Sequence, residues 1–131
     1  MSGEPHGPTV LVADDDAQLL GLIVRRLVGM GYRVIEAMDG EKAWKSAKRE
    51  RPALVVLDVM MPGMSGWEVC RRIREDEELG GTRILMLTGI GVRLNEMTSP
   101  LYGADDYLDK PFDFDTFEKK VRDVLAQPRA E

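Results

Sequence analysis

Five short runs of apolar residues recur along the chain, rich in Val, Leu and Ile and bounded by Gly, Pro or charged positions. Runs of this length are typical of strands that are covered on both faces of a sheet. The predicted strands are Thr9–Ala13, Tyr32–Ala37, Ala53–Leu57, Arg83–Leu87 and a weaker one at Asp105–Leu108.

Between these runs the apolar residues recur every three to four positions, which predicts amphipathic helices. The predicted helices are Ala17–Met30, Gly40–Glu50, one that begins at Ser65, and Phe112–Ala126. Asp16 and Asp39 stand where N-caps are expected, and Ser65 with Glu68 three residues later matches a capping box.

The regular alternation of strands and helices predicts an α/β fold with an all-parallel sheet and helices on both faces. In such a sheet the carboxyl ends of all the strands lie at one edge, where ligands bind. We therefore expect this edge to gather the residues at the strand ends: Asp14, Asp15, Asp58, Thr88 and Lys110. The alternative is local, with Asp14 and Asp15 as helix caps and Asp58 as the cap of a turn.

Composition narrows the chemistry. A chain of 131 residues fits one domain, and we see neither repeats nor an interdomain linker. A single cysteine, Cys70, excludes an internal disulfide, and a single histidine, His6, argues against Cys/His zinc sites and His-dependent nucleophilic catalysis. We therefore expect the functional groups of this protein to be carboxylates.

Charge and hydropathy exclude two kinds of partner. A net charge of -5 and a pI near 5.0 argue against nucleic-acid binding. The apolar runs are too short to span a membrane, and residues 1–8 lack the apolar core of a signal peptide. We therefore expect a cytoplasmic protein with a flexible N-terminal tail at 1–8 and a C-terminal tail at 127–131.

Carboxylates at close range repel one another and need a cation. Lys110 supplies one positive charge, and the remaining negative charge suits Mg²⁺ with oxygen ligands. An EF-hand calcium loop is the alternative, but Asp14, Asp15 and Asp16 are consecutive rather than alternate, and Leu19 stands where that loop requires Gly. A carboxylate beside Mg²⁺ can act as a nucleophile toward phosphorus.

Four motifs in this order resemble those of the response-regulator receiver domain of two-component signal transduction. They are V-L-V-A-D-D-D, V-V-L-D-V-M-M-P-G-M-S-G, L-M-L-T-G and G-A-D-D-Y-L-D-K-P-F. The resemblance covers residues 9–126 and implies a flavodoxin-like (βα)5 sandwich with strand order 2-1-3-4-5. It implies a signalling module rather than an enzyme, one that takes part only in its own phosphorylation and slow dephosphorylation.

The resemblance also implies roles for individual residues. Asp58 would accept the phosphoryl group, and Thr88 and Lys110 would contact it. Mg²⁺ would be bound by Asp15 directly, by Asp14 through water, by Asp58 and by the main-chain carbonyl of Met60.

Two further expectations concern switching and signal lifetime. Tyr107 would change rotamer as Thr88 moves, the alternative being that it packs on the last helix. Met60 and Ile90 occupy the positions that place the hydrolytic water in the family, and because both are apolar we predict slow loss of phosphate.

The implied partners are a sensor histidine kinase or a histidine phosphotransfer protein, and a downstream target or output domain. Phosphorylation is expected to change the surface around the fourth helix, fifth strand and fifth helix, with homodimer formation as one consequence. Pro100 falls in the expected fourth helix, which should be short or broken. The chain ends soon after the last helix, so we expect a stand-alone receiver or the receiver of a longer regulator.

Two other function classes share parts of this pattern. An aspartyl-phosphate phosphatase of haloacid-dehalogenase type needs a second acid two residues after the nucleophile, where Met60 stands. A flavodoxin-like cofactor binder needs a phosphate loop after the first strand, where three acids would repel phosphate.

Overall fold

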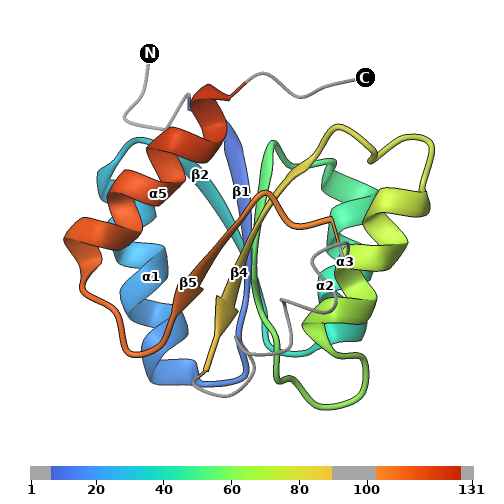
Figure 1. The fold of residues 1–131 in the computed structure, drawn as a ribbon, viewed down its shortest axis with the longest axis horizontal. Coiled ribbons are helices and arrows are strands. Elements are labelled where there is room, and N and C mark those ends of the chain that lie inside the picture. Colours follow the sequence, from blue (N-terminus) through green and yellow to red (C-terminus); the bar gives the residue numbers. More distant parts are fainter. Residues whose placement is uncertain (1–6, 90–102, 128–131) are drawn as a thin grey trace.

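The computed structural model describes residues 7–89 and 103–127. Its centre is a five-stranded sheet whose neighbouring strands are parallel, in the order β2-β1-β3-β4-β5 (Figure 1). This confirms the α/β class and the strand order implied by the sequence. The strands are β1 Thr9–Ala13, β2 Arg33–Ala37, β3 Leu54–Asp58, β4 Arg83–Thr88 and β5 Asp106–Asp109.

Helices cover both faces of the sheet. The helices α1 (Ala17–Gly29) and α5 (Phe114–Ala126) lie on one side, and α2 (Gly40–Glu50) and α3 (Gly66–Glu75) lie on the other (Figure 1). The predicted short or broken fourth helix around Pro100 falls within residues 90–102, outside the described part of the chain. Within the described residues, no helix has the length and apolar character needed to cross a membrane.

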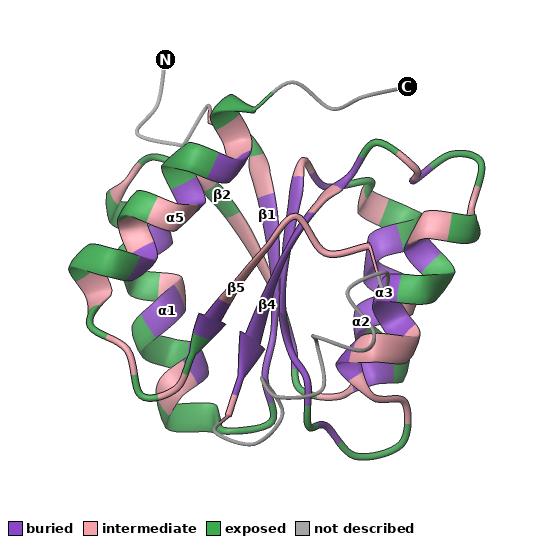
Figure 2. Cartoon of the chain, in the orientation of Figure 1, coloured by how far each residue is buried: buried purple, intermediate pink, exposed green. Residues whose placement is uncertain are grey.

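Alternate residues of each central strand belong to two separate hydrophobic cores. On β1, Val10 and Val12 join the core beneath α1 and α5, whereas Leu11 and Ala13 join the core beneath α2 and α3. All five residues of β3 are buried, which explains why this strand has no polar positions before Asp58 (Figure 2). The two cores hold β3 rigidly, and with it the carboxylate at its end.

Side-chain caps set the predicted helix starts. Asp16 accepts hydrogen bonds from the backbone N–H groups of Gln18 and Leu19, and Asp39 accepts one from Lys42. The last helix starts at Phe114, two residues later than predicted, because Asp113 is its N-cap and accepts from Thr116.

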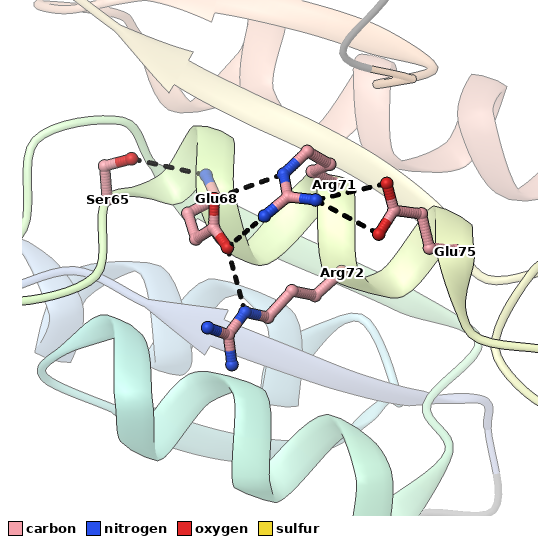
Figure 3. A network of polar contacts seen from close by, with 5 residues as sticks. All are labelled: Ser65, Glu68, Arg71, Arg72 and Glu75. Atoms are coloured by element: carbon pink, nitrogen blue, oxygen red, sulfur yellow. Dashed lines mark hydrogen bonds and ion pairs between the residues drawn. The ribbon is translucent and has the colours of Figure 1, made fainter.

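The capping box predicted for α3 forms only in part. Ser65 Oγ accepts a hydrogen bond from the Glu68 N–H at 3.2 Å, as expected. In the described structure the Glu68 carboxylate does not return to the Ser65 N–H, because it is bonded to the guanidinium groups of Arg71 and Arg72 (Figure 3). Arg71 also binds Glu75, so one exposed face of α3 is a network of ion pairs. Such exposed pairs contribute little individually to stability.

Two of the strands at the site, β3 and β4, are one residue longer at their carboxyl ends than predicted. Asp58 is the last residue of β3 and pairs with Leu87, and Thr88 is the last residue of β4 and pairs with Asp109. Cross-strand pairing therefore fixes the main chain of both residues.

Candidate phosphoacceptor and metal site

The loop after β3 folds back closely on Asp58. The N–H of Gly66 donates to the carbonyl of Val59 at 2.9 Å, and Val59 N–H donates to Leu87 O at 3.0 Å. A Cβ atom at Gly66 would lie 2.3 Å from the main-chain oxygen of Asp58. Only glycine permits this close approach, so Gly66 is required for the compact loop around the acid.

Three carboxylates meet at the carboxyl ends of β1 and β3. Asp14, Asp15 and Asp58 each offer an oxygen, and these oxygens lie within 4.8 Å of one another. Asp14 and Asp58 are 0% and 5% exposed, whereas Asp15 is exposed to solvent. The structure thus brings together acids that lie far apart in the sequence, because β1 and β3 are neighbours in the sheet.

Lys110 is the cation of this cluster. Its Nζ lies 2.9 Å from Asp14 Oδ2 and 3.4 Å from Asp58 Oδ2. Burial alone lowers the pKa of Lys110, but the hydrogen bond to Asp14 and the charges of Asp58 and Asp14 outweigh it and raise the pKa above 10.5. Lys110 therefore stays charged at neutral pH.

One ammonium does not offset the cost of burying Asp58. Desolvation and the neighbouring charge of Asp14 raise the pKa of Asp58 from 3.8 to about 6. Lys110 and the N–H of Met60, which donates to Asp58 Oδ1 at 3.3 Å, act in the opposite direction. Burial and the Asp14 charge together therefore outweigh the Lys110 ammonium at Asp58.

The donor set fits a hard divalent cation. All three side chains offer carboxylate oxygen, and neither imidazole nor thiolate lies in the cluster. This chemistry suits Mg²⁺, which prefers a few carboxylates together with carbonyl and water oxygen. The main-chain N–H of Met60 contacts Asp58, and the residue as a whole is 68% exposed.

Thr88 lies at the same edge of the sheet, but its hydroxyl is directed toward β5 rather than toward Asp58. Its hydroxyl donates a hydrogen bond of 2.6 Å to Asp109 Oδ1, on the neighbouring strand β5. Sequence reasoning missed Asp109. Asp109 could be found only from the pairing register of β4 and β5, which places it directly opposite Thr88. The sequence of either strand alone does not give that register.

Tyr107 packs on the α2–α3 side of the sheet. Its ring centroid lies 6.2 Å from that of Trp67, at an interplanar angle of 53°. It packs against the core beneath α2 and α3, and it also lines a pocket together with Thr116 and Lys120 of α5. Ile90, predicted to affect phosphate lifetime, lies outside the described residues.

Comparison with known proteins agrees with this geometry. The family model of the response regulator receiver domain matches residues 10–122. The chain is 39% identical over 120 residues to the DNA-binding dual master transcriptional regulator RpaA of Synechocystis, covering 92% of this chain and 50% of that protein.

Solved structures show the same fold. The chemotaxis response regulator CheY4 of Vibrio cholerae has a TM-score of 0.82 and 32% identity, covering 88% of this chain and 97% of that one. The receiver domain of sensor histidine kinase PA1611 from Pseudomonas aeruginosa, with a magnesium ion in its active site cleft, has a TM-score of 0.83 and 27% identity. That match covers 92% of this chain and 99% of the other.

The chain belongs to the response regulator receiver domain family. It is therefore a signalling module rather than a phosphatase or a cofactor-binding flavoprotein. The chain spans about half the length of the curated relatives it matches, several of which are described as transcriptional regulators.

Proposed function

We propose that Asp58 accepts a phosphoryl group from the phosphohistidine of a sensor histidine kinase or a histidine phosphotransfer protein, in an Mg²⁺-dependent reaction. The observation that carries this proposal is the position of Asp58. It is a buried carboxylate next to two other acids and 3.4 Å from the ammonium of Lys110. With a pKa of about 6, it is ionised and nucleophilic at neutral pH.

In the transfer, a carboxylate oxygen of Asp58 forms a bond to phosphorus as the bond from phosphorus to the imidazole nitrogen breaks. The electron pair of the broken bond remains on that nitrogen, and the product is an acyl phosphate. Lys110 stabilises the negative charge of the phosphoryl oxygens and draws them toward Asp58. Thr88 hydrogen-bonds another of these oxygens once its hydroxyl turns toward Asp58.

The acidic cluster would hold Mg²⁺ through Asp15 directly, Asp14 by way of water, Asp58 and the main-chain carbonyl of Met60. When bound, the ion neutralises the carboxylates and the phosphoryl oxygens. Asp14 also keeps Lys110 in position through their 2.9 Å ion pair. The cluster thereby orients the ammonium as well as binding the cation.

Phosphorylation of Asp58 changes the surface of the protein, and this change transmits the signal. Movement of Thr88 changes the rotamer of Tyr107, and the surface around the fourth helix, β5 and α5 changes with it. A downstream target, an output domain or a second copy of the chain responds to that surface in the cytoplasm. The apolar side chains of Met60 and Ile90 make loss of the phosphoryl group slow, so the protein's part in its own dephosphorylation is small.

The test is the intact mass after incubation with acetyl phosphate and Mg²⁺. Wild type should gain one phosphoryl group, and gain none when Mg²⁺ is chelated. Asp58→Asn should gain none, whereas the control Asp123→Asn, which changes an exposed acid in the last turn of α5, should behave as wild type. Phosphorylation of Asp58→Asn at wild-type level would refute the assignment.

A further inference from the structure

The hydroxyl of Thr88 is already bonded within the protein. Thr88 is 1% exposed, and its Oγ1 lies 2.6 Å from Asp109 Oδ1. The two residues are paired in the parallel register of β4 and β5, so their side chains project from the same face of the sheet. A hydrogen bond this short to a carboxylate is among the stronger kinds in proteins.

The direction of this bond matters because β4 lies between β3 and β5. Asp58 is on β3, on one side of Thr88, and Asp109 is on β5, on the other. A threonine hydroxyl carries a single hydrogen. It can be donated to Asp109 or to a phosphoryl oxygen on Asp58, and not to both.

We propose that Asp109 is a positioning residue that holds the Thr88 hydroxyl on the β5 side and competes with the phosphoryl group for it. The inference rests on the proposed function, since it assumes that Thr88 contacts a phosphoryl group on Asp58. Activation must then break the bond between Thr88 and Asp109. Asp109 thereby sets the amount of phosphodonor needed to switch the protein and favours the inactive arrangement.

The surroundings of Asp109 make this role separable from folding. Asp109 is exposed, so its replacement leaves no cavity. The main chain of Thr88 is held independently, because its carbonyl accepts a hydrogen bond of 2.6 Å from the N–H of Lys110. Variants at Asp109 should therefore fold with β4 and β5 still paired.

The test uses beryllofluoride, a stable mimic of the phosphoryl group, titrated in saturating Mg²⁺ with Trp67 fluorescence or amide NMR shifts as the readout. Asp109→Val removes the acceptor, and its β-branched side chain suits a strand. This variant should bind beryllofluoride at least about tenfold more tightly than wild type does. That factor corresponds to the free energy of one hydrogen bond to a charged group, which no longer has to be broken. Asp109→Asn keeps a neutral acceptor and should fall between Asp109→Val and wild type.

Two controls separate positioning from other effects. The affinity for Mg²⁺ alone should be unchanged in both Asp109 variants, whereas a structural disturbance of the site would alter it. In a Thr88→Ala background, Asp109→Val should bring no further gain, because the hydroxyl through which it acts is absent.

The inference is overturned if Asp109→Val binds beryllofluoride as wild type does. It is also overturned if the gain persists in the Thr88→Ala background, or if Asp109→Asn and Asp109→Val gain equally, since relief of charge repulsion would then explain it. Failure of wild type to bind beryllofluoride at Asp58 would instead refute the proposed function.

Discussion

The ammonium of Lys110 lies 2.9 Å from Asp14 Oδ2, although the two residues are 96 positions apart in the chain. This pair joins the ends of β1 and β5, the first and last strands of the chain, across the site. Three carboxylates, those of Asp14, Asp15 and Asp58, meet at this site, and Lys110 forms ion pairs with two of them, Asp14 and Asp58. This crowding of carboxylates leads to the first two predictions.

Mg²⁺ should stabilise the folded protein. An ion that binds only the folded state adds about 3 kcal/mol to the free energy of unfolding at a concentration one hundred times its Kd. Asp58→Asn should be more stable than wild type without the ion, because it removes a buried negative charge, and should gain less from it. Thermal or urea unfolding with and without millimolar MgCl₂ measures both, with NaCl at equal ionic strength as the control. An unfolding midpoint that does not respond to Mg²⁺ would contradict the metal site.

The contribution of Asp58 to the stability of the metal-free protein should fall as the pH rises from about 4 to about 6. The folded protein binds the Asp58 proton with a pKa of about 6, against 3.8 when the group is not perturbed. The folded state therefore binds this proton more tightly than the unfolded state does. The added free energy of unfolding is fully present below pH 3.8 and is lost as the pH rises above about 6. The loss amounts to at most about 3 kcal/mol.

The measurement is the difference in unfolding free energy between wild type and Asp58→Asn at several pH values, in the presence of a chelator. Taking the difference removes the contribution of other groups, including the acids Glu68, Asp76 and Asp113, whose pKa values are lowered. A difference that is constant across this pH range would show that Asp58 titrates normally.

Phosphorylation should change the fluorescence of Trp67. Its ring centroid is 6.2 Å from that of Tyr107, so a rotamer change of Tyr107 alters the surroundings of the indole. The experiment uses a Trp44→Phe background, which leaves Trp67 as the only tryptophan. Addition of acetyl phosphate with Mg²⁺ should shift its emission, and Tyr107→Ala should abolish most of the shift. An equal shift in Tyr107→Ala would exclude Tyr107 as the moving group.

The acyl phosphate should decay slowly. Met60, two residues after Asp58, is 68% exposed, and its side chain has no group that can orient a water molecule for attack in line with the phosphorus. Met60→Asn combined with Ile90→Glu should shorten the lifetime by about tenfold or more, the low end of what a positioned polar group contributes. First-order loss of phosphate is followed by mass spectrometry after removal of the donor. Equal rates in a folded, Mg²⁺-dependent double variant would show that these side chains do not control the lifetime.

Arg74 should be needed to hold the chain that enters β5. Its guanidinium lies 2.8 Å from Asp105 Oδ2, and their side chains are 15% and 9% exposed. It also donates to the carbonyls of Thr82 and Gly103. Arg74→Met leaves a buried carboxylate without this partner and should cost about 3 to 5 kcal/mol of unfolding free energy.

The matched control is Arg71→Met, on the exposed face of the same helix, which should cost less than about 1 kcal/mol because exposed ion pairs contribute little. Urea denaturation measures the unfolding free energy of both variants relative to wild type. Similar losses in the two would mean that burial does not distinguish Arg74.

Much of the fold follows from local patterns. The burial of β3 from Leu54 to Leu57 appears in the sequence as an unbroken apolar run, and the helix starts at Ala17 and Gly40 follow from the caps Asp16 and Asp39. These signals are local because a strand or a cap depends on residues a few positions apart. The gathering of Asp14, Asp15 and Asp58 also follows, since parallel strands place their carboxyl ends at one edge.

Only the tertiary structure decided which partner each polar side chain has. The sequence placed Thr88 at the rim but did not predict its bond to Asp109, and it paired Glu68 with Ser65 rather than with Arg71 and Arg72. The ion pair of Arg74 with Asp105 joins residues 31 positions apart, and no sequence pattern predicts it. Such pairings depend on strand register and on which of several acids lies nearest in space. The raised pKa of Asp58 likewise depends on its burial and on the nearby charge of Asp14, which lies far away in the sequence, so no local pattern encodes it.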